Sequence, residues 1–119
     1  MLWKLCALLA VAALAVAGSA LAAAERTTAT SVTVTAGKPS ELKFTLSKKS
    51  VAKGAVTFKV TNRGALAHDF RIAGKKTKLL RKGQSATLRV VLARAGKFPY
   101  LCTVPGHAAG GMKGTLTVK

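Results

Sequence analysis

Three residues with metal-binding side chains follow one another at spacings of five near the end of this 119-residue chain. They carry a thiol (Cys102), an imidazole (His107) and a thioether (Met112), and the only other histidine, His68, lies upstream. Thiolate and thioether are soft ligands that suit Cu(I), whereas imidazole binds both oxidation states of copper. The four side chains therefore predict a site for one copper ion, which would transfer single electrons by cycling between Cu(I) and Cu(II).

The flanking sequence places His68 and Cys102 on the inner faces of strands. Side chains alternate between the two faces of a strand, so His68 shares a face with Phe70, and the intervening Asp69 is expected to point outward. Cys102 shares a face with Tyr100 in the same way. A buried histidine needs a polar partner, and a backbone hydrogen bond would serve as well as a metal. The thiol and the second imidazole favour metal binding.

The segment between Cys102 and Met112 has the composition of a binding loop. Pro105 and Gly106 predict a turn immediately before His107. Taken singly, a buried cysteine or methionine is often only an apolar filler of a core. Their positions on either side of this histidine favour a ligand role for both.

Polar and apolar residues alternate along most of the chain, which is typical of half-buried antiparallel strands. Turn residues separate these alternating runs, and no segment shows the period of an amphipathic helix. Many short strands at such spacing predict an all-β fold, a β-sandwich of seven or eight strands. The alternating runs are 32–36, 42–46, 56–61, 68–72, 86–92, 98–102 and 115–119.

The N-terminus has the features of an export signal, with a positive Lys4, an uncharged apolar stretch and small residues at its end. We expect cleavage after Ala24, with Ala22 as the alternative, which leaves a flexible leader (25–31) and a copper-binding domain (32–119). An uncleaved membrane anchor is the alternative reading, because the uncharged stretch is long enough to span a bilayer. Either way, the protein is expected to be exported to the periplasm, the cell surface or the extracellular space.

Basic residues dominate the composition, with 20 Lys and Arg against 3 Asp and Glu. Loss of a signal that contains Lys4 lowers the net charge from +17 to +16. Export argues against a nucleic-acid partner, and the few aromatic residues are not interleaved with the basic ones. The charge instead favours an acidic redox protein that docks near His107 on a monomeric carrier, and a membrane surface is a possible but not a required partner.

The sequence resembles the cupredoxins, the blue type 1 copper proteins. The similarity lies in Asn62-x-Gly64 before His68-x-Phe70, in Gly96-x-Phe98-x-Tyr100-x-Cys102 and in the Cys102, His107 and Met112 loop. The tail is azurin-like, and the loop spacing is closer to auracyanin and rusticyanin. The resemblance implies a Greek-key sandwich of eight strands, electron transport, and copper held by His68, Cys102 and His107 in a plane with Met112 as a long axial contact.

Three positions depart from the pattern of that family. Asp69 stands where an Asn usually braces the cysteine loop, which leaves that brace open to question. Ala67 replaces the Gly whose carbonyl approaches copper in azurin, so no fifth ligand is implied. Leu101 replaces the exposed Tyr that plastocyanins often carry.

Two other functions compete with electron transfer. A copper-carrying or copper-buffering protein would use the same ligands but would exchange the metal itself. A zinc-binding or metal-free adhesion module is disfavoured, because zinc rarely takes a thioether such as that of Met112. No enzymatic activity is expected, because copper oxidases and nitrite reductases need more histidines than the two present.

Overall fold

The computed structural model describes residues 29–119, so the expected signal (1–24) and most of the expected leader lie outside the described residues. Nine strands and no helix are found in this part of the chain. The strands are β1 (Thr30–Ala36), β2 (Phe44–Leu46), β3 (Ser50–Val51), β4 (Gly54–Asn62), β5 (Arg71–Ile72), β6 (Lys75–Lys76), β7 (Ser85–Leu92), β8 (Gly96–Leu101) and β9 (Lys113–Val118). Residues 29–119 accordingly contain no helix that could cross a membrane.

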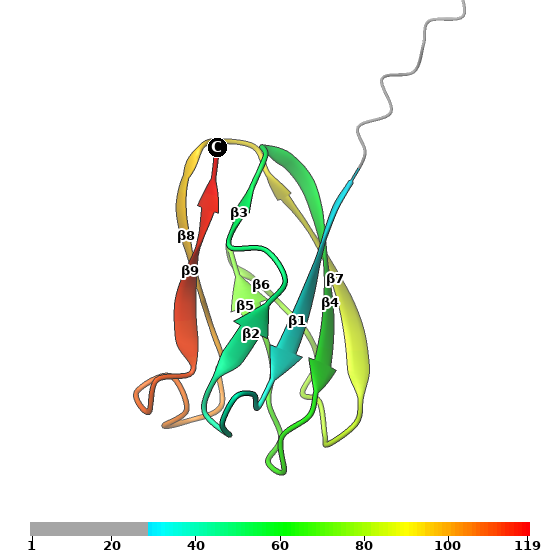
Figure 1. The fold of residues 1–119 in the computed structure, drawn as a ribbon, viewed down its shortest axis with the longest axis vertical. Helices are drawn as coiled ribbons and strands as arrows, with labels where there is room; N and C mark the ends of the chain where they lie inside the picture. The colour runs from blue at the N-terminus through cyan, green and yellow to red at the C-terminus, as the bar shows by residue number, and fades with distance from the viewer. Residues whose placement is uncertain (1–28) are drawn as a thin grey trace, which may run out of the picture.

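The strands form two sheets, with the orders β2-β1-β4-β7 and β3-β9-β8-β5-β6. The sheets pack face to face as a sandwich (Figure 1), which confirms the predicted all-β class. The strands number nine rather than seven or eight, because the two-residue strands β3 and β6 are too short to leave an alternating pattern.

The strand pairing is mixed, whereas the sequence suggested antiparallel strands throughout. The β1–β4 and β3–β9 pairs are parallel, and the other pairs are antiparallel. Alternation reports which side chains are buried and carries no information on the direction of the neighbouring strand. The parallel pairs therefore could not be read from the pattern.

The core joins the segments that carry His68 and Cys102. Phe70 packs against Phe44, Phe58 and Tyr100, with ring centroids 5.4, 5.2 and 5.5 Å apart respectively. Phe70 lies two residues after His68, and Tyr100 lies two residues before Cys102. Aromatic pairs at such distances add to the stability that burial provides. This cluster therefore holds the two site-bearing segments in fixed register.

Three loops meet at one end of the sandwich, opposite the C-terminus (Figure 1). They are residues 37–43, 63–70 and 102–112, which follow β1, β4 and β8. All three lie at the end where their preceding strands finish. This end contains every residue that the sequence singled out as a candidate ligand.

Candidate metal centre

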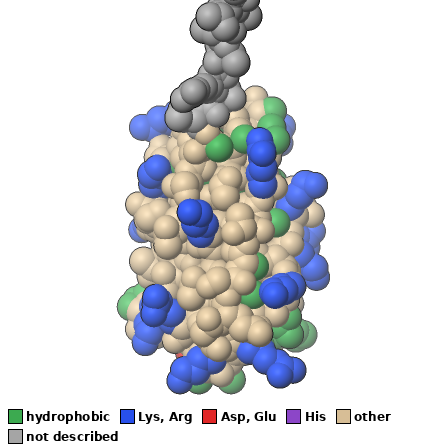
Figure 2. Space-filling model, turned by 90° about the vertical axis from the view of Figure 1, so that its right-hand side faces the viewer, with side chains coloured by type: hydrophobic (Ala, Val, Ile, Leu, Met, Phe, Trp, Pro, Cys, Tyr) green, Lys and Arg blue, Asp and Glu red, His purple; other side chains and the backbone are tan. Residues whose placement is uncertain are grey.

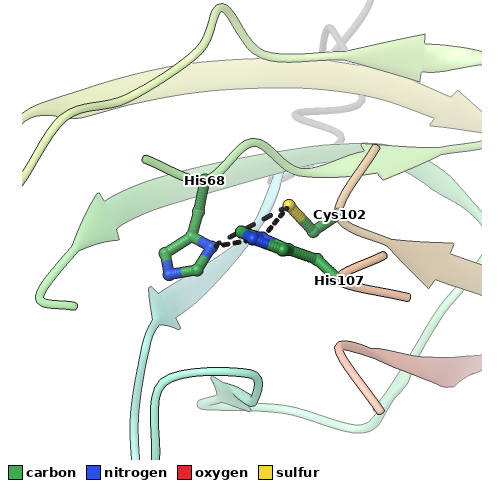
Figure 3. A group of neighbouring side chains, drawn as sticks. All are labelled: His68, Cys102 and His107. Atoms are coloured by element: carbon green, nitrogen blue, oxygen red, sulfur yellow. Dashed lines mark hydrogen bonds between the residues drawn. The ribbon is translucent and has the colours of Figure 1, made fainter. Parts of the chain in front are cut away.

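His68, Cys102 and His107 point their donor atoms toward one another (Figure 3). The Nδ1 atoms of the two histidines are 3.1 Å apart. The Sγ of Cys102 lies 3.9 Å from Nδ1 of His68 and 3.6 Å from Nδ1 of His107. Residues far apart in the sequence thus form one compact triangle of two nitrogens and one sulfur.

Backbone hydrogen bonds at the ends of strands and in the loops between them position this triangle. His68 lies between β4 and β5, where its N–H and C=O pair with Leu80 at 3.0 and 2.8 Å. Cys102 follows directly after β8, and its N–H donates to the carbonyl of Met112. His107 lies in the turn between Cys102 and Met112, and its carbonyl accepts the N–H of Met112. The bonds of Met112 to Cys102 and His107 close the loop by joining its two ends.

Met112, the predicted fourth ligand, is fully buried beside the triangle. It packs in a small apolar cluster with Cys102 and Ala36, which is separate from the main core. The loop therefore brings the thioether residue next to the thiol, as the sequence suggested. Its role as a ligand remains a prediction.

Glu41 belongs to the site, although the motif analysis did not select it. One carboxylate oxygen, Oε1, lies 2.9 Å from Nε2 of His68 and accepts the N–H of Leu66 at 2.7 Å. The other, Oε2, accepts the N–H of Ala65 at 3.0 Å. The two backbone N–H groups, more than His68, lower the pKa of Glu41 to about 2. The one feature of the sequence that could have drawn attention to Glu41 is its rarity, since it is one of only three acidic residues in a basic chain.

Ionisation of Glu41 determines which nitrogen of His68 carries a proton. A carboxylate has only acceptor atoms, so the contact requires that Nε2 of His68 donates its proton to Oε1. When the imidazole is neutral, its Nδ1 then has a free lone pair that faces Cys102 and His107. Metal ligation by histidine needs this arrangement of proton and lone pair.

The expectation that Asp69 faces outward was wrong, because this side chain is only 4% exposed. The chain becomes a regular strand only at Arg71, so alternation does not apply at position 69. Asp69 turns inward and accepts the backbone N–H of Thr103 at 2.6 Å and the hydroxyl of the same residue. The carboxylate thus braces the residue after Cys102.

The donor set and its spacing fit one metal ion. Nitrogen and sulfur ligands lie about 2.0 to 2.3 Å from a metal such as zinc, so two ligands of one ion lie within about 4.4 Å of each other. All three sides of the triangle are shorter than that limit. Burial raises the pKa of the Cys102 thiol, so metal binding must displace its proton. A buried thioether beside the thiol favours copper over zinc.

Acid should destabilise the metal-free protein through Glu41. The pKa of this carboxyl group is about 2 in the folded protein, against an ordinary value of 4.5. Its contribution to stability is therefore complete above the ordinary value and is lost as the pH falls toward 2. In thermal unfolding of metal-free protein, the difference between wild type and Glu41→Gln should be largest near neutral pH and should shrink on acidification. A difference that stayed constant with pH would contradict this assignment.

Comparison with known proteins gives consistent matches. A family model for the cupredoxin-like domain matches residues 5–118. Auracyanin-B of Chloroflexus aurantiacus is 45% identical over 42 residues, which cover 35% of this chain and 18% of that protein. The aligned segment is thus less than a fifth of that relative's length.

Solved structures of auracyanin and rusticyanin share the fold. Auracyanin from Roseiflexus castenholzii superposes with a TM-score of 0.63 at 24% identity, over 76% of this chain and 98% of that chain. Rusticyanin from Thiobacillus ferrooxidans superposes with a TM-score of 0.64 at 22% identity, over 75% of this chain and 76% of that chain. At these identities the similarity supports the fold, and the residues of the site must carry the functional argument.

Proposed function

This chain belongs to the cupredoxin-like family, and from that premise we propose that it is an exported, monomeric carrier of single electrons between redox proteins. The observation that carries the proposal is the triangle of His68, Cys102 and His107, whose donor atoms all lie within 4.8 Å of one another. A bound copper ion would supply the one-electron change between Cu(I) and Cu(II).

The protein's contribution is to hold these side chains in one arrangement for both oxidation states. His68 is fixed by Glu41 and by its bridge to Leu80, and Cys102 by the brace between Asp69 and Thr103. His68, Cys102 and Met112 are each at most 1% exposed, so water has little access to the site. A site that changes little between the two states exchanges electrons without large rearrangement.

His107 is the expected point of electron exit. It is half-buried, whereas His68 and Cys102 are fully buried. Apolar and glycine residues surround it in sequence, and no charged residue occurs between Cys102 and Met112. These residues form a rim with no charge of its own, which lets a partner approach closely, and the Nζ of Lys43 lies beside it at Gly111. The half-buried or exposed members of this rim are Val104, Pro105, Gly106, Ala108, Ala109, Gly110 and Gly111.

Basic side chains are spread widely over the surface, the end that carries the site loops included (Figure 2). Figure 2 shows Lys and Arg side chains distributed along the full height of one face. Such a field raises the rate of encounter with acidic partners and weakens as salt screens it, with a Debye length of about 8 Å at physiological ionic strength. We infer an acidic redox partner that is attracted by this field and that docks on the uncharged rim of His107.

Electrostatic steering and docking should affect different rate constants, the first the rate of association and the second the rate of electron transfer within the complex. Charge reversal at the exposed Lys75, Lys76 or Lys78 should slow association with an acidic electron carrier and reduce its salt dependence. Ala108→Glu should instead slow electron transfer at saturating partner, because charge on the rim separates the redox centres. Ala93→Glu is the matched control, since it makes the same change between β7 and β8 at the opposite end of the sandwich (Figure 1).

The measurement is stopped-flow reduction by small acidic and basic redox proteins across a salt series. Faster reaction with the acidic carrier at low salt would support the proposal. Equal rates with both carriers at every salt concentration would contradict it. Retention of copper through repeated, reversible redox cycles would separate an electron carrier from a protein that passes on the metal.

Export is compatible with this geometry. The described chain enters the fold at β1, at the end opposite the loop of His107 (Figure 1). The point at which the preceding segment joins the fold is thus distant from the proposed docking rim. We propose the periplasm or the outer cell surface as the location. Cys102, the one cysteine of residues 29–119, supports this, because metal ligation would protect a thiol in an oxidising compartment.

A further inference from the structure

Negative charge in the described part of the chain is concentrated at the metal centre. Lys4, Glu25 and Arg26 precede the described residues, which leaves 18 of the 20 basic residues and 2 of the 3 acidic ones. Those two are Glu41 and Asp69, and both contact the candidate site: Glu41 through His68 and Asp69 through Thr103. The rest of the basic surface of residues 29–119 therefore carries no acidic side chain.

Glu41 reaches His68 across a gap of 27 residues in the sequence. His68 is fully buried, whereas the Glu41 side chain is 34% exposed, so the carboxylate approaches the ring from the surface side. The Nε2–H of His68 and two backbone N–H groups all donate to the same carboxylate. Charged acceptors of this kind form hydrogen bonds about twice as strong as neutral ones.

The loop after β4 is shaped to admit this carboxylate. A Cβ atom on Gly64 would lie 2.6 and 2.9 Å from the two carboxylate oxygens of Glu41. Asn62 holds the loop from the other side, because its Oδ1 accepts the N–H of Gly64 and its Nδ2 donates to the carbonyl of Leu66. The N–H groups of Ala65 and Leu66 are thereby left facing Glu41. The carboxylate of Glu41 thus fits a pocket of backbone N–H donors beside His68.

We propose that Glu41 is a positioning residue that holds His68 with its proton on Nε2 and lowers the reduction potential of the copper site. The inference rests on the proposed function. A carboxylate behind the imidazole increases the basicity of the ligand and places negative charge near the metal. Both effects favour Cu(II) over Cu(I), because the ion with the higher charge gains more. Glu41 would thus counter the general positive field of the surface.

Glu41→Gln is the direct test. The glutamine oxygen can still accept from His68 and Leu66, whereas its amide nitrogen faces the N–H of Ala65, so the shape is kept while the charge and one hydrogen bond are lost. Loss of such a partner typically weakens metal affinity 10- to 100-fold. We expect a loss of this size for Cu(II) and a loss at least tenfold smaller for Cu(I). A tenfold difference corresponds to a rise in reduction potential of about 59 mV.

Two further variants separate this role from structure and from net charge. Gly64→Ala keeps the charge but displaces the carboxylate, and it should raise the potential in the same direction. Ser40→Lys is the matched control: it raises the net charge by one at an exposed neighbouring residue and leaves the hydrogen bonds of Glu41 in place. Its potential should stay close to that of wild type.

The measurements are the reduction potential, the Cu(I) and Cu(II) affinities, and the imidazole N–H resonances of the metal-free protein. The Nε2 proton of His68 should exchange slowly in wild type and faster in Glu41→Gln. An unchanged potential in Glu41→Gln, or an equal shift in Ser40→Lys, would overturn the inference. Failure of wild type to bind copper reversibly would instead overturn the proposed function, while the proton-exchange comparison would still report on the contact between Glu41 and His68.

Discussion

Replacing Cys102 with serine should abolish the colour of the copper-loaded protein. Charge transfer from a thiolate to Cu(II) gives sites of this kind an intense visible absorption, and Cys102 is the only cysteine in the described residues. A serine hydroxyl is not a soft ligand and has no comparable transition. The effect should be complete, because no other residue in the triangle can replace the sulfur. A visible spectrum of the oxidised proteins is the measurement.

Two controls make that result interpretable. Wild type loaded with zinc should be colourless, which shows that the colour requires copper as well as the thiolate. The metal-free serine variant should unfold at a temperature close to that of metal-free wild type, since the two side chains are similar in size. A coloured Cys102→Ser protein, or a colourless Cu(II) complex of wild type, would exclude the proposed site.

Replacing His68 with alanine should cost far more copper affinity than replacing Met112 with glutamine. His68 supplies one corner of the triangle, so we expect a loss greater than the roughly 100-fold that removal of an outer partner causes. A thioether is a weak, soft ligand that favours Cu(I). Met112→Gln supplies a harder oxygen and should lower the reduction potential while copper remains bound. Copper titration and voltammetry of both variants test this.

The two substitutions also differ in what they do to the core. Met112 is fully buried, and glutamine has a similar length, so the variant fills the same space but buries a polar amide. Unfolding of the metal-free variants separates that cost from metal binding. Equal loss of copper in both variants would mean that Met112 is a primary ligand and that the expected geometry is wrong.

The sequence pattern was sufficient to predict the fold class and to place two of the candidate ligands among buried residues. Alternation placed His68 and Cys102 among buried side chains, and both are at most 1% exposed. Alternation succeeded at Cys102 because this residue directly follows β8 and keeps its period of two, whereas His68 lies outside the regular strands, in an isolated bridge with Leu80. It did not give the strand directions, since a parallel and an antiparallel neighbour bury the same residues.

The sequence by itself supplied the candidate ligands, because thiol, imidazole and thioether groups are fixed by residue type and the chain has only two each of Cys, His and Met. Only the tertiary structure decided the surroundings of those groups. Asp69 turned inward because regular strand begins two residues later, and Glu41 met His68 because two irregular loops converge at one end of the sandwich. Irregular backbone has no period, so neither contact leaves a pattern in the chain.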